Sequence, residues 1–477
     1  MKLYFDVEDR PGRKDNLLFA FQQMIAIMAA TLLVPILMTA YGLPSDPAAA
    51  LFGAGIGTLV YIFCTRKKSP VFLGSTFTFL GAYSASIGYG YGYWGVMIGV
   101  LIAGLVYVVF ALVIKAVGSA WVNKLMPAVI AGPIVTLIGL SLSGTATGWL
   151  QTNGGDTYSL ITIAVGLFTF FAIVFSTVKG YKVMKMFPFI FGVGAGYILS
   201  LILTLIGIAA NIPALQILSF QPFIDTFGTF SLKSIVSVPG LYIIRAFQTK
   251  GEYLPIDGTA IANLILIYAP IAVVELAQHV GDHKNLGNII GRDLITDPGL
   301  DKTLLGDGIG SIVGTVFGSC ANTTYGESIG CLAITGNAST YTIRTAALGC
   351  MILSFFTPFV ALINSIPKCV MGGACVALYG LIAVSGLQLL SKVDLGDNRN
   401  LYVVSAILVC GIGGLSLNFG HNAATGGSLI SLTALAASLI VGLITKKICG
   451  QGNEQITKSV DGFSSHVEGM KDVDMDK

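Results

Sequence analysis

The chain has 477 residues, of which 54% are hydrophobic and 11% charged, with a net charge of +3 and a mean hydropathy of +0.80. About 25% of the residues of a typical soluble domain are charged, so this composition excludes an ordinary soluble protein and predicts a polytopic membrane protein. Seven of the eight cysteines lie in or at the ends of apolar segments, and none lies in a long polar loop, which argues against a disulfide framework or a zinc site.

The first fifteen residues are polar and include both acids and bases, so 1–15 is predicted to be a cytoplasmic N-tail rather than a cleaved signal peptide. Hydropathy and Gly/Pro punctuation then predict seven spans, at 16–40, 47–64, 71–87, 94–116, 121–142, 158–178 and 185–208. A more polar stretch, 209–257, is predicted to be an external loop. Seven further spans are predicted at 258–280, 305–319, 323–336, 341–365, 368–388, 400–418 and 425–445. The polar stretch after them, 448–477, is predicted to be a cytoplasmic C-tail.

The basic residues support this count of fourteen spans. With both termini in the cytoplasm, 23 of the 27 lysines and arginines face inward, which leaves Lys233, Arg245, Lys250 and Lys368 outside. Cytoplasmic loops of membrane proteins carry an excess of Lys and Arg. An odd number of spans would lose this asymmetry.

The two halves of the chain resemble each other. Pro127 and Gly132, followed by Leu-x-Gly-Leu from Leu137, match Pro367 and Gly372, followed by Leu-x-Gly-Leu from Leu378. Each half, 16–208 and 258–447, holds seven spans, and an odd number per repeat makes the second half enter the membrane with the opposite orientation. The sequence therefore predicts an all-α membrane protein of two inverted seven-span repeats, an architecture of secondary transporters.

The third and tenth spans are too short and too polar for continuous spanning helices, which need about twenty apolar residues. Both are interrupted by Gly, Ser and Thr, and both are third in their repeat. Broken helices at matching positions indicate a substrate site. We expect their extended parts, 72–77 and 322–327, to pair as a short antiparallel ribbon between two half-helices, which would satisfy their backbone groups.

Glu327 follows the break in the tenth span. A charged side chain in the membrane costs about 2.5 to 3.5 kcal/mol even on the lenient insertion scale, so a carboxylate here predicts a binding role. The alternative is that Glu327 only caps its own helix.

The eighth span has a polar face formed by Glu275, Gln278 and Asp282, which are spaced i, i+3 and i+7. Alternatively, Asp282 and His283 already belong to the cytoplasmic loop. His279 points away from this face and is expected to be structural.

Two other spans carry isolated polar residues. The first contains Gln22 and Gln23, and the ninth contains Asp307, which either supports the site or caps its helix.

Several runs resemble the nucleobase–ascorbate transporter family, and especially its bacterial uracil permeases. They include Ala277 to Gly281, Arg292 to Leu300, Phe317 to Ser319, Asn322-Thr-Thr-Tyr-Gly-Glu327 and Pro367 to Gly373, and in the first half Ala29 to Pro35, Leu51 to Leu59 and Leu73 to Ser75 with Phe77. The resemblance implies a fourteen-span fold divided into a core domain and a gate domain, a homodimer joined through the gate, and proton-coupled nucleobase uptake.

The resemblance also implies a site. Glu327 and Gln278 would bind the edge of the base, the backbone at Tyr325 and Gly326 would meet a carbonyl group, and Phe77 would stack on the ring. Asp282 would lie near the proton path, and the supporting or proton-coupling residues would be Asp307, Gln23 and Glu275.

The chain departs from the family pattern at three places. Gln22-Gln23 stands where the family has Gln-His, and Gln278 stands where it has a carboxylate. In the run after Glu327, Ser328 stands where the family has Asn. Gln278 matters most, because an amide both donates and accepts hydrogen bonds whereas a carboxylate only accepts. It also removes a titratable group, so proton coupling would rest on Glu327, Asp282, Asp307 or Glu275.

The sequence favours uracil or a related pyrimidine as substrate, and Gln278 with the Gly281-Asp282 pair keeps purines such as xanthine or uric acid open. An anion exchanger or channel of the same fold is disfavoured by the acid at Glu327. No nucleophile–base pair or metal cluster suggests an enzyme. We expect a plasma-membrane transporter, in the inner membrane of a bacterium, whose partners are a nucleobase, protons, the lipid bilayer and a second copy of itself, with no cofactor and no nucleic acid.

Overall fold

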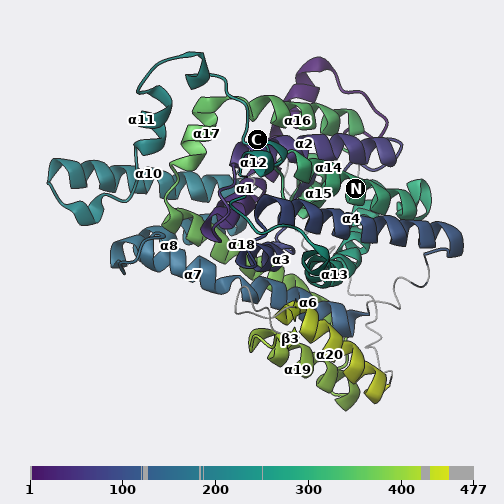
Figure 1. The fold of residues 1–477 in the computed structure, drawn as a ribbon. Helices are drawn as coiled ribbons and strands as arrows, with labels where there is room; N and C mark the ends of the chain where they lie inside the picture. Colours follow the sequence, from purple (N-terminus) through teal and green to yellow (C-terminus); the bar gives the residue numbers. More distant parts are fainter. Residues whose placement is uncertain are drawn as a thin grey trace.

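The computed structural model describes residues 3–119, 121, 127–181, 184–185, 187–249, 251–419 and 430–450. Helices dominate these residues, with two short two-stranded sheets among them (Figure 1). Within these described ranges, eight helical segments are long and apolar enough to cross a membrane. The chain is therefore a multi-pass membrane protein.

The described elements of the first half lie in or near the predicted spans except α7, which lies beyond the span predicted to end at 142. They are α1 (Arg13–Ala40), α2 (Pro47–Cys64), β1 (Leu73–Ser75), α3 (Leu80–Gly88), α4 (Gly92–Val117), α6 (Ala128–Ser141), α7 (Ser143–Thr152), α8 (Leu160–Val178) and α10 (Pro188–Ala209). Asp46 caps α2 by accepting a hydrogen bond from the Ala48 N–H, and Pro47 occupies the first helical position, where its fixed φ is favourable.

Four short helical pieces occupy the stretch predicted to be an external loop. They are η1 (Pro213–Leu215), α11 (Gln221–Phe227), η2 (Leu232–Ser234) and α12 (Tyr242–Gln248). Val236 bridges to Phe356, and the Ser237 N–H donates to the Phe355 carbonyl group, 3.0 Å away. This stretch is therefore packed against the beginning of α17.

The second half contains α13 (Gly258–Ile290), the π-helical turn η3 (Ile295–Gly299), α14 (Leu300–Val316), β2 (Asn322–Thr324), α15 (Gly326–Thr335), α16 (Thr340–Leu353), α17 (Thr357–Asn364), α18 (Lys368–Leu390), α19 (Asn398–Ile412), β3 (Leu417–Phe419), β4 (Ile430–Leu432) and α20 (Ala434–Cys449). β3 and β4 pair antiparallel, with Asn418 opposite Ser431.

Several predicted boundaries in the second half were wrong. The span predicted at 305–319 begins at Leu300, and the span predicted at 341–365 is divided into α16 and α17. α13 continues ten residues past the expected end at 280 and stops at Gly291, whose φ of 70° ends the helix. The expected helix 400–418 ends at Ile412, because glycines follow and Gly414 has a φ of 72°, and the chain then enters β3.

Packing sorts the long helices into two groups. The ribbon bundle consists of α1 to α4, α13 to α16 and the pair β1–β2; the second bundle consists of α6, α7, α8, α10 and α18 to α20. In the ribbon bundle α2 packs on α14, α1 on α16 and α4 on α13, and in the second bundle α6 packs on α18. Elements of the two halves of the chain are thus interleaved, as the neighbouring α2 and α16 in Figure 1 illustrate.

Glycines allow close helix contacts in both bundles. A Cβ atom on Gly57 of α2 would lie 2.8 Å from the Gly310 carbonyl oxygen of α14, and one on Gly139 of α6 would lie 2.6 Å from the Tyr379 carbonyl oxygen of α18. Small residues at such contacts let backbones approach inside a membrane, where dispersion contacts drive helix association.

The N-tail is attached to the ribbon bundle. The Ser339 hydroxyl donates to the Asp9 carbonyl group at 2.7 Å, and the Arg292 guanidinium contacts Asp6 at 2.8 Å and Glu8 at 3.3 Å. Partial burial opposes ionisation of Asp6, but the Val7 N–H and Arg292 outweigh it and lower the pKa of Asp6 below its usual range. The N-tail therefore connects the C-terminal end of α13 with the N-terminal end of α16.

Candidate substrate site

The site is organised around β1 and β2, which together are called the ribbon. The two strands run antiparallel, with Leu73 opposite Thr324, Gly74 opposite Thr323 and Ser75 opposite Asn322. Each strand leads into a short helix, β1 into α3 and β2 into α15. The predicted pairing of the two extended segments is confirmed.

Neighbouring helices satisfy the outer edges of the ribbon. The backbone N–H groups of β1 and β2 and of the residue before β1 donate to side-chain oxygens: Leu73 to Thr58 at 2.9 Å, Asn322 to Ser311 at 3.0 Å, Thr324 to Asp307 at 3.1 Å and Phe72 to Ser328 at 3.0 Å. Irregular backbone can persist at membrane depth when protein groups surround it in this way.

Asp307 is a fully buried anchor of β2. Its carboxylate accepts hydrogen bonds from the Thr324 N–H at 3.1 Å, from the Thr324 hydroxyl at 3.1 Å and from His279 Nδ1 at 2.7 Å. Asp307 lies in the second turn of α14, because that helix begins at Leu300, so the interpretation as a helix cap was wrong. His279, whose Nε2 lies 3.0 Å from the Thr303 hydroxyl, is the structural residue that was expected.

A second buried hydrogen-bond network begins at His283, and the sequence analysis missed two of its residues, Tyr61 and Ser69. His283 Nδ1 donates to the His279 carbonyl oxygen at 2.9 Å, since a carbonyl oxygen only accepts. In the neutral imidazole, Nε2 is then the acceptor and receives the Tyr61 hydroxyl at 2.7 Å, while Ser69 lies 2.8 Å from the same hydroxyl. Tyr61 and Ser69 gave no local signal, because neither residue type is unusual in an apolar span.

The polar face of α13 lies against the ribbon. Glu275 is 2% exposed, Gln278 is exposed and Asp282 is half-buried. Gln278 hydrogen-bonds to Asp282. Because α13 runs to Ile290, Asp282 and His283 lie inside the helix, and the alternative that places them in a loop is wrong.

Hydroxyl groups from both sides of the ribbon meet Glu275. Thr78, just before α3, and Thr323, in β2, hydrogen-bond to its carboxyl group. Among the residues that the structure describes, its Oε2 atom has no hydrogen-bond partner, and neither has Asp282 Oδ2.

Glu327 occupies the first turn of α15. Tyr325, the residue before α15, gives no side-chain cap, and the Glu327 carboxylate accepts a hydrogen bond from its own backbone N–H, which is the capping contact that the alternative predicted. Gly326 is exposed and Glu327 is half-buried, so this end of the helix is accessible. The carboxylate and the helix N-terminus can still bind a molecule that carries both donors and acceptors.

Gln23 connects α1 to this end of α15. It is 4% exposed, and its amide donates to the Ser328 hydroxyl, which also accepts the Phe72 N–H. Gln22 is half-buried, and its Oε1 atom has no partner within the described part of the chain. Gln23 thus supports both half-helices.

Phe77 lies between the two bundles. It is 7% exposed, and its ring packs edge-on against Tyr379 of α18, with the ring centroids 6.0 Å apart. A cavity of about 150 Å³ adjoins it, lined by Phe77, Thr78, Gly81 and Ile271 on one side and by residues of α6 and the start of α20 on the other.

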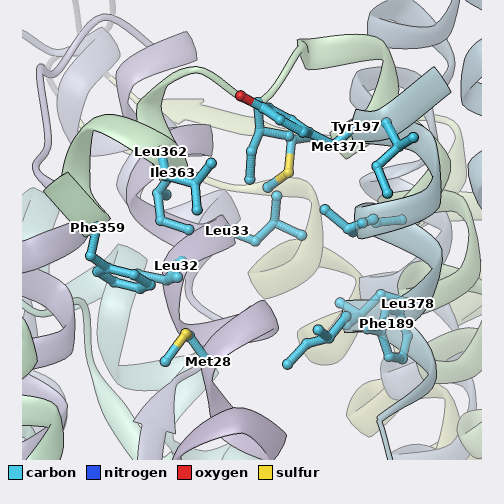
Figure 2. A pocket seen from close by; sticks show the side chains of 16 residues that line it. Met28, Leu32, Leu33, Phe189, Tyr197, Phe359, Leu362, Ile363, Met371 and Leu378 are labelled. Carbon is cyan, nitrogen blue, oxygen red and sulfur yellow. The ribbon is translucent and has the colours of Figure 1, made fainter. Parts of the chain in front are cut away.

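A larger cavity, of about 350 Å³, lies between α1, α10, α17 and α18 (Figure 2). Its lining is apolar, with Met28, Leu33, Phe359 and Leu378 among its side chains, and the Tyr197 hydroxyl at its edge is bonded to Ser365. A heterocyclic base requires hydrogen-bonding groups, so the ribbon is the better candidate for the substrate site.

The structure thus brings most predicted site residues to one place. Phe77, Tyr325, Gly326 and Glu327 flank the ribbon. Glu275 meets it from α13, where Gln278 and Asp282 are bonded to each other further along the same helix, Asp307 anchors it from α14, and Gln23 reaches it from α1 through Ser328. Within the described residues no group of three or more His, Cys, Asp or Glu side chains is arranged to hold a metal ion.

Comparison with known proteins identifies the family. The sequence profile of the Permease family matches residues 14–419. The uracil permease of Bacillus caldolyticus is 35% identical over 470 residues, covering 98% of this chain and 99% of that protein, and the uracil permease of Escherichia coli K12 is 33% identical over 443 residues, covering 92% and 94%.

Among solved structures, the transmembrane domain of the cyanobacterial bicarbonate transporter BicA superposes with a TM-score of 0.57 at 16% identity, covering 90% of this chain and 97% of that domain. At this identity the likeness concerns the fold alone. The family match and the relatives together show a membrane transporter rather than an enzyme, and the chain belongs to the Permease family, which includes the bacterial uracil permeases.

Proposed function

We propose that the protein is a secondary active transporter that imports uracil or a related pyrimidine across the plasma membrane by proton symport. The observation that carries the proposal is that Glu327 and the α15 N-terminus follow the ribbon while Glu275 of α13 meets it, in a chain whose relatives over nearly their full length are uracil permeases.

The chemistry of the base matches these groups. Uracil presents alternating N–H donors and carbonyl acceptors along its edge. Glu327 accepts from an N–H group, the backbone N–H groups at Tyr325 and Gly326 donate to a carbonyl group, and Gln278 either donates or accepts. Phe77 supplies an apolar ring face for stacking.

The packing supports two inverted repeats of seven spans, 16–208 and 258–447. The contacts occur in related pairs: α1 packs on α16 as α13 packs on α4, and α1 packs on α15 as α13 packs on α3. In an inverted repeat of seven spans, α1 corresponds to α13, α3 to α15 and α4 to α16. Each contact between the two halves should therefore occur twice, with the corresponding helices exchanged.

In this proposal the ribbon bundle is the core domain and the second bundle is the gate. The site lies where they meet, beside Phe77 and Tyr379, so movement of one bundle against the other exposes it to either side of the membrane in turn. The gate supplies the dimer contact, and both termini lie in the cytoplasm.

Radiolabelled uptake into proteoliposomes with an inward proton gradient tests the function. The wild type takes up uracil, and unlabelled uracil competes better than xanthine or uric acid. Glu327→Gln lowers uptake about 10- to 100-fold, since a hydrogen bond to a charged group contributes about 1.5–3 kcal/mol. The exposed Glu252→Gln is the control and leaves uptake unchanged. Undiminished proton-dependent uptake by Glu327→Gln would refute the assigned role of Glu327.

A further inference from the structure

We propose that Glu275 carries the proton that moves with the substrate, and that the Thr323 and Thr78 hydroxyls transmit its protonation state to the ribbon. This inference rests on the proposed proton symport and names the residue that performs it.

The surroundings of Glu275 suit a group that gains and loses a proton. Its side chain is 2% exposed, and among the described residues Oε2 is without a partner, while the Thr78 and Thr323 hydroxyls bond to the carboxyl group. A carboxylate that keeps an unsatisfied oxygen in an apolar interior loses its hydration without compensation. A proton on Oε2 removes the charge and lowers that cost.

Asp307 provides the contrast within the same site. Successive side chains of a strand point to opposite faces, so Thr323 and Thr324 meet different partners. Thr324 meets Asp307, whose carboxylate accepts from three donors, whereas Thr323 meets Glu275. Full hydrogen bonding suits a structural role for Asp307 in supporting the ribbon, and the free oxygen suits proton exchange at Glu275.

The titratable groups that interact electrostatically with Glu275 are Asp307 of α14, Tyr107 of α4 and Asp282 of α13. The Tyr107 hydroxyl is buried and has no hydrogen-bond partner among the described residues. From α15, Glu327 adds a further negative charge that acts on Asp282.

Other titratable groups of these elements have different positions or partners. His279 is bonded to Asp307, and the Tyr83 hydroxyl of α3 accepts a hydrogen bond from the Ala321 N–H. Among the bases, Lys115 is in the last turn of α4, Lys302 is in the first turn of α14, and Lys284 is an exposed residue of α13. The described parts of α6, α20 and β4 that pack on α13 contribute apolar side chains and hydroxyls near Ile271.

A route to Glu275 begins at the 150 Å³ cavity between the bundles. Thr78 lines this cavity and also bonds to Glu275, and Ile271, one helical turn before Glu275, lines it too. A proton from water in the cavity forms the O–H bond at Oε2 and changes the charge of the carboxyl group from −1 to 0. Release to water on the other side reverses the step. Because Thr323 belongs to the ribbon and Thr78 follows Phe77 directly, proton binding and substrate binding there influence each other reciprocally.

The test compares Glu275→Gln with wild type and with the exposed control Glu252→Gln in proteoliposomes. Glu275→Gln keeps the shape of the side chain but cannot exchange a proton. We expect it to retain uracil counterflow, an exchange that needs binding and bundle movement without net proton transfer. We expect at least a 10-fold loss of uracil accumulation driven by a pH gradient, and loss of the internal acidification that a trapped pH dye reports in wild type.

Glu275→Asp serves as the second variant if Glu275→Gln does not fold. It restores a titratable group in a changed position, so it transports protons with uracil but with a shifted pH midpoint of uptake. A merely structural role would lower uptake at every pH without moving the midpoint.

Three results would overturn the inference. Glu275→Gln could accumulate uracil and acidify the lumen as wild type does, Glu275→Asp could keep the wild-type pH midpoint, or accumulation could require sodium instead of protons. In each of these cases wild-type uracil transport still stands. Absence of uracil counterflow in the wild type would instead refute the proposed function, and this inference with it.

Discussion

Asp307 holds β2 through the backbone and the hydroxyl of Thr324, and it is itself held by His279. Removing one partner of such a buried group leaves the others unsatisfied and typically costs about 1–3 kcal/mol, or more when a charge is involved. We expect Asp307→Asn to lower the melting temperature of the purified protein by several degrees. A thermal-shift assay monitored by size-exclusion chromatography measures this.

Asp301, in the first turn of the same helix, is the control. It is half-buried and close to the N-terminus of α14, where a carboxylate contributes about 0.3–1 kcal/mol. Asp301→Asn should therefore change the melting temperature much less. Equal effects of the two substitutions would contradict the anchoring role of Asp307.

Individual polar residues in apolar spans could be predicted from the sequence, but their partners could not. Glu275, Gln278, Asp282 and Glu327 stand out because charged and amide side chains are rare in spanning helices. The bond between Gln23 and Ser328 joins residues 305 positions apart, which no local pattern encodes. Tyr61 and its contact with His283 were missed for the same reason.

At the scale of elements, the contact between α6 and α18 depends on glycine. A Cβ atom on Gly139 would lie 2.5 Å from the Ala383 N atom and 2.6 Å from the Tyr379 carbonyl oxygen. We expect Gly139→Ala to force the helices apart and lower the melting temperature. Gly380→Ala in α18 is the matched control, because nothing lies within 4 Å of its added Cβ and alanine favours the helix by up to about 1 kcal/mol. A stabilised Gly139→Ala would show that the two helices do not meet there.

The N-tail contact should depend on pH through Asp6. Its pKa is lowered in the folded state, so ionised Asp6 contributes stability above its unfolded pKa of about 3.9, and this is lost as the pH falls through the lower folded value. We expect Asp6→Asn to raise hydrogen exchange of residues 3–9 at pH 7. In wild type a similar rise, corrected for the intrinsic rate, should appear only below about pH 4. Identical exchange in the two proteins at pH 7 would contradict the contact with Arg292.

The positions of the helices and strands could be predicted from the sequence better than the residues at which they end. The interruptions by Gly, Ser and Thr near 73–78 and 319–328 revealed the ribbon, because an apolar spanning helix does not tolerate them. The ends of α13 and α19 were misplaced, since α13 continues through charged residues that tertiary contacts accommodate and α19 stops at glycines before a strand pair.

For the whole molecule, the fourteen-span topology makes a prediction about accessibility. Cysteines introduced for Glu252, in the predicted external loop, and for Lys68, in a predicted cytoplasmic loop, lie on opposite sides of the membrane in this topology. A membrane-impermeant maleimide should label Glu252→Cys in intact cells, and Lys68→Cys only after permeabilisation. Labelling of Lys68→Cys in intact cells would contradict the orientation.

The central claim is that the acid of α15 and the polar face of α13 bind a pyrimidine base beside the ribbon. Uptake of radiolabelled uracil into proteoliposomes, with and without a protonophore and excess unlabelled uracil, tests it most directly. The account predicts saturable uptake that excess uracil blocks, that the protonophore collapses and that Glu327→Gln largely abolishes. Uptake that is absent, or that bicarbonate rather than uracil inhibits, would contradict it.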